Sequence, residues 1–223
     1  MRGKLIVIEG TDCSGKETQT NLLIERLRND NIKVQNFSFP NYNSPTGKII
    51  GGPYLGKSYI CDSFFEEGAT KVDPKVASLY YAADRKYNID KIEFLLEHGA
   101  NVILDRYIYS NMAHQGGKIS SYDDRVKMYD WLDNLEFDLL SLPKPDIAIF
   151  LHMPTDKALI LKSGRDEEAD GHEKDTEHLK MAEKAYIELA SKYDMHVIEC
   201  AGTTIRDIND ISDDVYNYVM KYL

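Results

Sequence analysis

The chain has 223 residues, of which 43% are hydrophobic, and it carries a formal net charge of −10 at pH 7. That length suits one α/β domain with a full core and is a little short for two, so we expect a single domain over residues 1–223. Binding to a polymeric nucleic acid draws most of its energy from lysine and arginine side chains that neutralise phosphates. The acidic charge therefore argues against a polymeric nucleic acid as partner.

The cysteines and the N-terminus indicate the compartment. Cys13, Cys61 and Cys200 are odd in number and widely spaced, which argues against a disulfide framework or a metal cluster and fits a reducing environment. The apolar run that follows residues 1–4 is too short for a signal peptide or a membrane span. We therefore expect a cytoplasmic protein without a membrane partner.

Short apolar runs alternate with longer stretches of helical periodicity, which is typical of βαβ units. Five strands are predicted, at residues 4–9, 33–38, 101–105, 146–152 and 195–199. Helices are predicted at residues 16–29, 46–57, 74–98, 121–140, 155–162, 175–193 and 205–221. The expected fold is therefore α/β, with a five-stranded parallel sheet flanked by helices.

The turn from the first strand into the first helix reads GTDCSGKET. Such a turn leaves several backbone N–H groups pointing at one spot, where the helix dipole also favours an anion. Lys16 adds a positive charge for the β- and γ-phosphates of a nucleotide. The alternative is a glycine-rich turn with a solvated lysine. The pattern favours an ATP-binding phosphate loop made of Gly10, Thr11, Asp12, Cys13, Ser14, Gly15, Lys16, Glu17 and Thr18.

One residue of this loop is unusual. A serine or threonine whose hydroxyl binds Mg²⁺ normally follows the loop lysine, and this chain has Glu17 there. Thr18 cannot take over, because one step along a helix rotates the side chain by about 100°. A carboxylate is still a hard oxygen ligand that can reach the metal directly or through a water. Glu17 is therefore a candidate ligand for Mg²⁺.

Ligands of open parallel sheets lie beyond the carboxyl ends of the strands. The segments there are the phosphate loop, FPNY at 39–42, DRY at 105–107 and AGT at 201–203, and we expect them to converge on one cleft. The polar segment SGRDEEADGHEK at 163–174 has the composition of a lid over a phosphate site. A solvated surface loop explains that composition equally well.

The phosphate loop, FPNY at 39–42, YAADR at 81–85, DRYIYSNMAHQGG at 105–117 and the lid-like segment follow one another over nearly the whole chain. In this order and spacing they resemble the thymidylate kinase family. The resemblance implies a P-loop nucleoside monophosphate kinase with a lid, which uses Mg²⁺ and moves the γ-phosphate of ATP onto dTMP. The products would be dTDP and ADP, in dTTP biosynthesis. The resemblance also implies a homodimer.

By this resemblance, Lys16, Arg106 and Arg165 would surround the transferred phosphoryl group together with Mg²⁺. Asp105 would orient the metal and its waters, and Arg106 would hold the acceptor phosphate with its planar fork. Some relatives carry a loop arginine where this chain has Cys13, so the lid arginine, Arg165, would supply that charge. The lid of this chain is more acidic than the arginine-rich pattern of the family.

The resemblance also implies an acceptor site. Tyr81 and Arg85 share one helix face, where the ring would stack on thymine and the guanidinium would read a base carbonyl. Tyr80 is then the neighbouring candidate for the core, and Asn111 would donate to the base. The other implied acceptor residues are Asp12 toward the sugar 3′-hydroxyl, Phe39, Pro40 and Tyr42 in the wall, Arg106, Ser110, and His114 or Gln115 near the sugar.

Two other functions stay open at this level. A kinase for another acceptor, such as dUMP, CMP or a deoxynucleoside, would share the phosphate loop and the lid. A nucleotide-binding regulator without turnover would fit a metal site that Glu17 has disabled. The presence of Asp105, Arg106 and Arg165 favours the enzyme over the regulator, and the motifs at 81–85 and 110–111 favour thymine.

Overall fold

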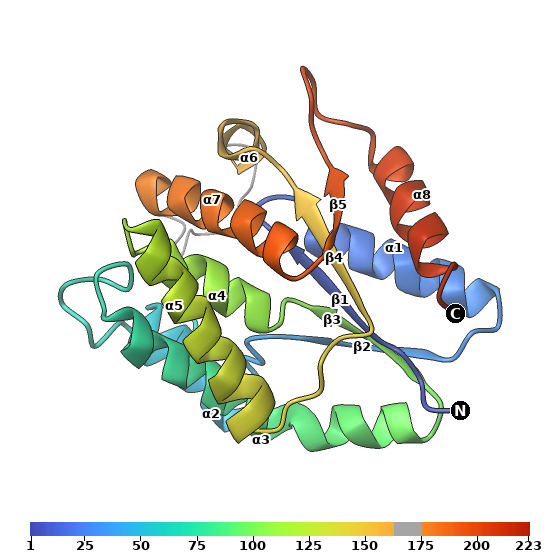
Figure 1. The fold of residues 1–223 in the computed structure, drawn as a ribbon, viewed down its shortest axis with the longest axis horizontal. Coiled ribbons are helices and arrows are strands. Elements are labelled where there is room, and N and C mark those ends of the chain that lie inside the picture. The colour runs from blue at the N-terminus through green and yellow to red at the C-terminus, as the bar shows by residue number, and fades with distance from the viewer. Residues whose placement is uncertain (163–174) are drawn as a thin grey trace.

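A parallel sheet of five strands lies at the centre of the computed structural model, which describes residues 1–162 and 175–223 (Figure 1). The strands run in the order β2-β3-β1-β4-β5. Their bounds are β1 (Leu5–Gly10), β2 (Val34–Ser38), β3 (Asn101–Asp105), β4 (Ile147–His152) and β5 (His196–Glu199). β1 is buried at every position because it pairs with β3 on one side and with β4 on the other. The predicted five-stranded parallel sheet is confirmed.

Helices cover both faces of the sheet. α1 (Lys16–Asn29) and α8 (Ile208–Val219) lie on one face; α3 (Pro74–Glu97), α4 (Ile108–Gly116), α5 (Tyr122–Asp133) and α7 (Thr176–Lys192) lie on the other (Figure 1). Alternate residues of a strand point to opposite faces. Leu5 and Val7 of β1 therefore join the core beneath α3, α4 and α7, whereas Ile6 and Ile8 join the core beneath α1 and α8.

Most predicted helices are present, with small changes at their ends. The stretch predicted at 46–57 is α2 (Pro45–Ile49) followed by a π-helical turn (Ile50–Tyr54), and α6 spans Thr155–Lys162. The stretch predicted at 121–140 is α5 followed by a second π-helical turn (Asn134–Leu139). α8 begins later than the predicted residue 205, because Asp207 caps it by accepting from the Asn209 N–H at 2.8 Å.

Helix α4 is absent from the sequence prediction, which treated its motif as a strand-end segment. Every residue from Ile108 to Ala113 is buried, and the polar residues Ser110, Asn111, His114 and Gln115 recur with helical spacing on one side, a pattern that the sequence prediction did not use. α4 packs against α3, α5 and α7 and begins directly after β3. It therefore places the DRY motif and the residues after it beside the phosphate loop.

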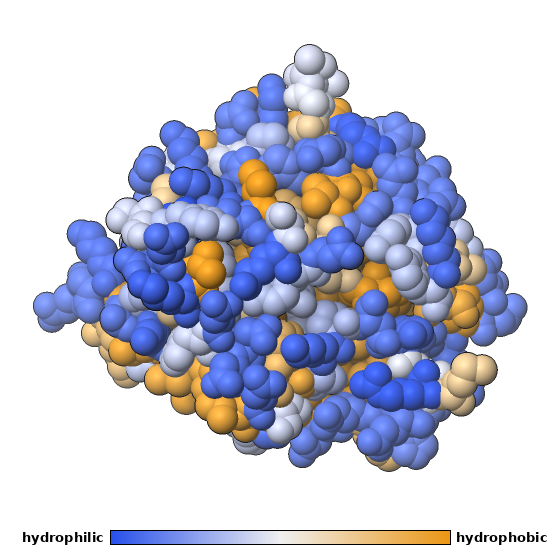
Figure 2. All heavy atoms as spheres, in the orientation of Figure 1, coloured by the Kyte–Doolittle hydropathy of each residue, from blue (hydrophilic) through white to orange (hydrophobic). Residues whose placement is uncertain are grey.

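The face of the molecule in Figure 2 is mostly hydrophilic, with several separate hydrophobic clusters. Within residues 1–162 and 175–223, no helix has both the length and the apolar character that crossing a bilayer demands. The termini lie apart from the carboxyl ends of the strands, where the phosphate loop is found (Figure 1).

His152 connects the ends of two strands with a helix of the outer layer. Its Nδ1 lies 2.7 Å from Oε2 of Glu199 at the end of β5, and its Nε2 lies 3.1 Å from Oε1 of Glu183 in α7. Glu183 also accepts from the Thr155 N–H at 2.9 Å, at the start of α6. The hydrogen bond with Glu183 is the main cause of a raised pKa for His152, and Glu199 adds to it.

We expect this contact to make stability depend on pH. The folded pKa of His152 is raised, so its stabilisation is complete below the unfolded pKa of about 6.5 and is lost as the pH rises through the folded value. Urea unfolding of the wild type and of His152→Asn should therefore differ more at about pH 5.5 than at about pH 8.5.

The matched control is His98→Asn, at an exposed histidine at the end of α3 whose ring contacts the Phe94 carbonyl. Its effect on the free energy of unfolding at about pH 5.5 should be smaller than that of His152→Asn, because its exposed ring contacts a carbonyl oxygen and not two carboxylates. An equal effect of His152→Asn at both pH values would contradict the assignment.

Candidate active site

The phosphate loop has the backbone conformation that its glycines permit. Gly15, the residue before α1, has φ +80° and Cys13 has φ 58°, both in the left-handed region. A Cβ on Gly10 would lie 2.4 Å from Ser14 Oγ and 2.8 Å from the Leu151 carbonyl oxygen, so only glycine fits there. The predicted turn from strand to helix is present, with its N–H groups gathered at the start of α1.

The side chains at the end of the phosphate loop differ in burial. Lys16 is buried and donates from Nζ to the Thr11 carbonyl oxygen at 2.7 Å. Burial, followed by the charge of Arg106, lowers the pKa of Lys16 to about 8. Glu17 and Thr18 are exposed on the first turn of α1. The buried cation therefore lies where the loop would enclose a phosphate, and the two neighbours point away from the core.

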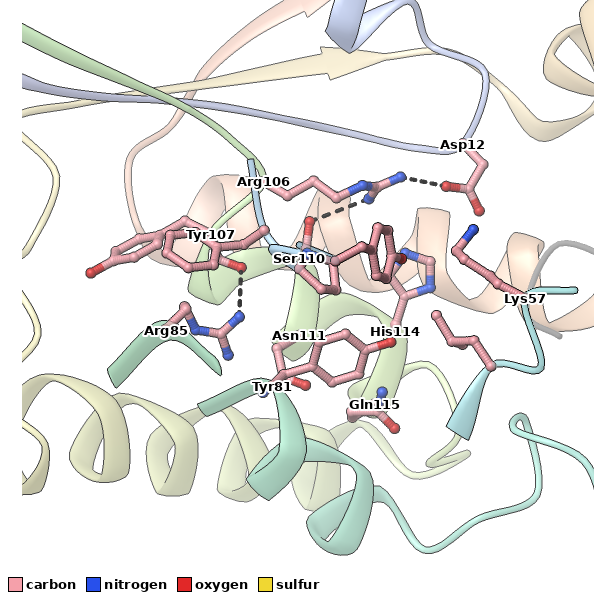
Figure 3. A pocket seen from close by; sticks show the side chains of 14 residues that line it. Asp12, Lys57, Tyr81, Arg85, Arg106, Tyr107, Ser110, Asn111, His114 and Gln115 are labelled. Atoms are coloured by element: carbon pink, nitrogen blue, oxygen red, sulfur yellow. Dashed lines mark hydrogen bonds and ion pairs between the residues drawn. The ribbon is translucent and has the colours of Figure 1, made fainter. Parts of the chain in front are cut away.

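A pocket beside the loop collects all eleven residues expected to bind the acceptor (Figure 3). They come from the phosphate loop, from the segment after β2, from α3, from the turn after β3 and from α4. The sequence analysis missed Leu55, Lys57 and Tyr107, which also line it. The AGT segment at 201–203 does not line this pocket, so the expectation that every strand end converges there is only partly met.

Asp12 and Arg106 form an ion pair in the wall of the pocket. Arg106 Nη2 donates to Asp12 Oδ1 at 2.6 Å, and Nη1 lies 3.3 Å from Ser110 Oγ (Figure 3). Burial alone would raise the pKa of Asp12, but the Arg106 guanidinium holds that pKa well below its usual range. The carboxylate expected to meet the sugar hydroxyl thus also orients the arginine expected to hold the phosphate.

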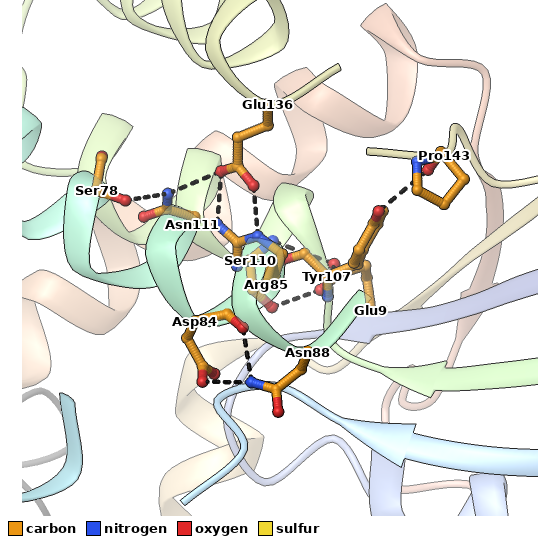
Figure 4. A network of polar contacts seen from close by, with 10 residues as sticks. All are labelled: Glu9, Ser78, Asp84, Arg85, Asn88, Tyr107, Ser110, Asn111, Glu136 and Pro143. Atoms are coloured by element: carbon orange, nitrogen blue, oxygen red, sulfur yellow. Dashed lines mark hydrogen bonds and ion pairs between the residues drawn. The ribbon is translucent and has the colours of Figure 1, made fainter. Parts of the chain in front are cut away.

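Glu9 holds the backbone around this arginine. Its side chain is fully buried, and Oε1 accepts from the N–H groups of Tyr107 at 2.8 Å and Ser110 at 3.1 Å (Figure 4). Oε2 accepts from Ser110 Oγ at 2.5 Å and from the Tyr186 hydroxyl at 3.1 Å. Arg106 itself has φ 67°, a left-handed conformation that a non-glycine residue keeps only when its neighbours are fixed.

Sequence reasoning missed Glu9, although one signal was present. It is the only charged residue in the apolar run of β1, directly before the phosphate loop. A carboxylate at the start of a helix interacts favourably with the unpaired N–H groups and the dipole. Burial raises the pKa of Glu9, while the hydrogen bond from Ser110 and the charge of Arg106 act in the opposite direction.

Arg85 does not point freely at a base, as the resemblance implied. Its Nε and Nη2 both donate to the carboxylate of Glu136, each at 2.5 Å, and both side chains are buried (Figure 4). The remaining nitrogen, Nη1, lies 3.5 Å from the Tyr107 carbonyl oxygen at the pocket wall. The guanidinium therefore offers the pocket one nitrogen, and Glu136 fixes its orientation.

Asn111 uses its amide nitrogen for contacts within the protein, whereas the sequence analysis expected this side chain to donate to the base. Its Nδ2 lies 3.3 Å from the Ser78 carbonyl oxygen and 3.2 Å from Glu136 Oε1, so the protein uses the donor side (Figure 4). Oδ1 is buried without a hydrogen-bond partner. The expectation that Asn111 donates to the base is therefore wrong for this arrangement. It presents an acceptor instead.

Gln115 and the two tyrosines of α3 complete this end of the pocket. Gln115 is fully buried, and neither its Oε1 nor its Nε2 has a hydrogen-bond partner. Tyr81 lines the pocket and meets Tyr54 edge-on, with ring centres 5.9 Å apart. Tyr80 packs against Tyr54 and Phe65 and, like Tyr81, is partly buried against this small core, so burial does not separate the two; Tyr81 is the one that lines the pocket.

His114 lines the pocket from α4 and contacts α7. Its Nδ1 is 3.3 Å from Nε2 of His178 in α7, and its ring meets Tyr186 edge-on. His178 is buried, and its backbone N–H donates to Asp175 at the start of α7. His178 in α7, far along the chain, therefore contacts the pocket residue His114. The sequence pattern does not reveal this contact.

Asp84 anchors the FPNY segment that forms the outer wall. Its carboxylate is buried and accepts from the Asn41 N–H at 2.8 Å, from Ser44 Oγ at 2.9 Å and from Thr46 Oγ1 at 2.7 Å. Asn88, one turn further along α3, donates to the same carboxylate at 2.9 Å. Asp84, the fourth residue of the YAADR motif, is thus a positioning residue for the wall and not a substrate contact.

The candidate metal ligands lie at the same edge of the sheet. Asp105 ends β3, and its Oδ1 is buried without a partner, as is the Ser14 hydroxyl in the phosphate loop. Residues 1–162 and 175–223 contain no cluster of three histidine, cysteine or acidic side chains that would bind a metal alone. Mg²⁺ commonly takes one or two carboxylates plus substrate phosphates, so the donor set fits it. Arg165 lies outside the described residues.

Removing Glu9 should destabilise the protein strongly. Glu9→Ala would leave two N–H groups and two hydroxyls buried without their acceptor, so we expect a loss of about 3 kcal/mol in the free energy of unfolding. Amide hydrogen exchange at Tyr107 and Ser110 should accelerate as well. Denaturant unfolding and exchange measured on the same samples check both effects.

Two variants make this test specific. Glu9→Gln keeps one acceptor oxygen and should lie between the wild type and Glu9→Ala. Glu25→Ala removes an exposed carboxylate from α1 and should change stability by less than about 0.5 kcal/mol. Equal unfolding curves for Glu9→Ala and Glu25→Ala would refute the anchoring role.

Known proteins share both this sequence pattern and this architecture. The profile of the family described as thymidylate kinase matches residues 8–210. The thymidylate kinase of Plasmodium falciparum (isolate 3D7) is 30% identical over 220 residues, which cover 99% of this chain and 91% of that protein. A probable thymidylate kinase of Pyrococcus horikoshii is 31% identical over 232 residues, covering 100% and 98%.

A solved structure agrees with these relatives. The thymidylate kinase of Candida albicans superimposes with a TM-score of 0.73 at 27% sequence identity, over 99% of this chain and 92% of that one. The fold of this chain therefore agrees with that structure. This protein is therefore a kinase that belongs to the thymidylate kinase family.

Proposed function

We propose that this protein transfers the γ-phosphate of ATP to dTMP and releases dTDP and ADP. The observation that carries the proposal is one pocket, lined by all eleven expected acceptor residues, that adjoins the phosphate loop through Asp12. Two nucleotides bound in these places would meet where the buried cation Lys16 and the partly buried Arg106 lie. The acceptor is therefore a nucleoside monophosphate and the donor is ATP.

The polar groups of the pocket suit thymine as the base. Asn111 Oδ1 accepts, the Arg85 Nη1 donates, and the buried Gln115 amide offers both kinds of group. Thymine carries one N–H donor between two carbonyl acceptors, which is the pattern that such a set would satisfy. The ring of Tyr81 supplies a flat aromatic surface next to them. Buried orphan groups cost free energy until a ligand pairs them, so they favour a base with matching polarity.

Phosphoryl transfer depends mainly on alignment and on stabilising spread negative charge, so no covalent nucleophile is required. Lys16 donates to the phosphates of ATP, and Arg106 donates to the phosphate of the acceptor. The pKa of about 8 leaves Lys16 mostly protonated near neutral pH, and a bound polyphosphate stabilises that charge further. Asp12 keeps Arg106 oriented and accepts from the sugar hydroxyl of the acceptor.

Asp105 and the phosphates of ATP would hold Mg²⁺, with Glu17 as a second carboxylate close to the loop. The unpaired buried oxygen of Asp105 supports this assignment. The bound ion would neutralise charge on the phosphates during transfer. The Ser14 hydroxyl, which also has no partner, supplies a further oxygen at the same loop.

We also infer that residues 1–223 form a single kinase domain in which the segment 163–174 acts as the lid. Arg165 in that segment would supply the positive charge that Cys13 does not. The single sheet, with helices on both faces, supports one domain. The cytoplasmic location inferred from the cysteines suits an enzyme that draws on the cellular pool of nucleotides.

A homodimer through α3 is supported by an apolar stripe on that helix. Val76, Leu79, Tyr87 and Phe94 are each more than 40% exposed, and their spacing puts them along one side. Figure 2 shows hydrophobic atoms gathered along the lower left edge, where Figure 1 has α3 and α5. A second copy of the chain would bury this stripe.

Charges on the stripe should therefore separate the subunits. Leu79→Glu combined with Tyr87→Glu should convert a dimer into a monomer, because burying two carboxylates in an apolar interface is costly. Sedimentation velocity checks the mass, and Asn21→Glu on the exposed side of α1 is the control. A wild-type chain that sediments as a monomer at all concentrations would exclude this interface.

The acceptor is tested by ADP release from ATP and Mg²⁺ with dTMP, dUMP, CMP, UMP, AMP, GMP and thymidine at equal concentrations. We expect dTMP to turn over fastest, and Gln115→Ala to raise the KM for dTMP about tenfold because a buried amide contact is lost. Faster turnover of another monophosphate would keep the kinase and reject thymine as the base. ATP binding without turnover on any acceptor would favour the regulator.

A further inference from the structure

Glu136 belongs to none of the motifs found in the sequence, yet it holds two side chains of the acceptor pocket. It is not one of the residues that line the pocket, and its side chain is fully buried. Its carboxylate accepts from Nε and Nη2 of Arg85, each at 2.5 Å, and its Oε1 lies 3.2 Å from Asn111 Nδ2 (Figure 4). One carboxylate therefore engages donors of Arg85, from α3, and of Asn111, from α4.

The backbone of Glu136 is fixed by the π-helical turn (Asn134–Leu139) that follows α5. Its carbonyl oxygen accepts from the Leu142 N–H at 2.9 Å. Leu142 and Phe137, the residue next to Glu136, are both buried in the core beneath α3, α4 and α7. Turns of this kind are uncommon and occur frequently at functional sites. The carboxylate is therefore presented to the pocket residues from a well-supported backbone.

The chain just after this turn supports a third residue of the pocket. The Pro143 carbonyl oxygen accepts from the Tyr107 hydroxyl at 3.1 Å, and Tyr107 is fully buried (Figure 4). The Tyr107 carbonyl oxygen lies 3.5 Å from Nη1 of Arg85, the nitrogen that Glu136 does not engage. All three nitrogens of this guanidinium therefore have a fixed neighbour, which restricts how the group can turn.

These contacts decide which polar atoms are left for a ligand. Asn111 Nδ2 is used by Glu136 and by the Ser78 carbonyl oxygen at 3.3 Å. Asn111 Oδ1 is buried and has no hydrogen-bond partner in the described part of the chain. The two ends of an asparagine amide have nearly the same shape, so the neighbours set which end points where. Removing the carboxylate of Glu136 would let both the amide and the guanidinium change their orientation.

Pyrimidine bases differ at the edge that such groups would contact. Thymine and uracil carry an N–H between two carbonyl groups, whereas cytosine carries a ring nitrogen with a lone pair next to an amino group. An amide oxygen and a guanidinium N–H that are held in place match the first pattern. Against cytosine, they would set a lone pair against a lone pair and a donor against a donor. Buried polar groups without a match are costly, so a pocket with fixed polarity discriminates between these bases.

We propose that Glu136 is a positioning residue that makes the pocket select thymine and uracil over cytosine, because it fixes the polarity of Asn111 and Arg85 before a ligand binds. This inference rests on the proposed function, since it presumes that a pyrimidine nucleoside monophosphate enters this pocket. Glu136 acts without touching the ligand. The methyl group that distinguishes thymine from uracil lies at another position of the ring, so its recognition does not depend on Glu136.

The experiment measures kcat and KM with dTMP, dUMP and dCMP in the wild type and in Glu136→Gln. This variant keeps the size of the side chain and replaces one acceptor oxygen by a donor. The KM for dTMP and for dUMP should each rise about tenfold, with kcat changed less than about twofold, because the groups around the phosphates stay in place. The preference for dTMP over dCMP in kcat/KM should fall about tenfold, and the preference over dUMP should stay the same. Asp138→Asn, at an exposed residue of the same turn, is the matched control and should change none of these values.

Two further measurements decide the question even if Glu136→Gln alone does not fold. Combining it with Arg85→Gln leaves neither partner of the pair charged. Relative to Arg85→Gln alone, the double variant should lower kcat/KM for dTMP by less than about threefold, since most of the effect of Glu136 passes through Arg85. In the wild type, NMR should show the Arg85 Nε–H protected from exchange with and without dTMP, because Glu136 holds it in both states.

Each other outcome has a definite meaning. An unchanged preference for dTMP over dCMP in Glu136→Gln, or rapid exchange of the Arg85 Nε–H in the dTMP complex, would overturn the positioning role and leave the proposed kinase intact. Equal losses of kcat/KM for all three acceptors would also overturn it, because they would show that Glu136 only stabilises the fold. A wild type that phosphorylates none of the three acceptors would overturn the proposed function together with this inference.

Discussion

The buried carboxylate of Glu9 is the contact on which the rest of the site depends. It satisfies the N–H groups at the start of α4 and thereby holds Arg106 in a left-handed conformation beside the phosphate loop. An ionised group in the core is costly unless several donors surround it, and here two N–H groups and two hydroxyls do so. The donor and acceptor halves of the site are therefore joined through one side chain of the central strand.

Carboxylates also hold the polar side chains and the loop around the acceptor pocket. Arg85 is held by Glu136 and Arg106 by Asp12, while Asp84 fixes the loop that forms the outer wall. In both ion pairs the carboxylate also fixes the orientation of the arginine. The polar groups of the pocket are therefore oriented before a ligand binds. By contrast, Asn111 Oδ1 and both amide atoms of Gln115 are buried without a hydrogen-bond partner. These atoms mark where a ligand must supply the matching donors and acceptors.

Much of the fold and of the site could be predicted because the relevant signals are local. An apolar run followed by glycines and a lysine specifies the strand, the turn and the helix of the phosphate loop, since each depends on neighbours in the chain. Helix α4 escaped prediction because its nine residues were interpreted only as a motif that follows a strand, although its polar residues recur with helical spacing. The polarity of Asn111 and the pairing of Arg85 escaped for another reason. Both depend on Glu136, far along the chain.

The sequence by itself determined the five strands, most of the helices, the phosphate loop, the kinase family and eleven of the residues that line the pocket. Only the tertiary structure decided how those residues are used. Glu136 and Lys57 reach the site from segments outside the motifs, and Glu9 and Asp84 bind backbone groups far from them along the chain, so no spacing along the chain encodes these contacts. The physical reason is that periodicity reports which face a residue occupies, whereas the partner of a buried charge is set by packing between distant elements.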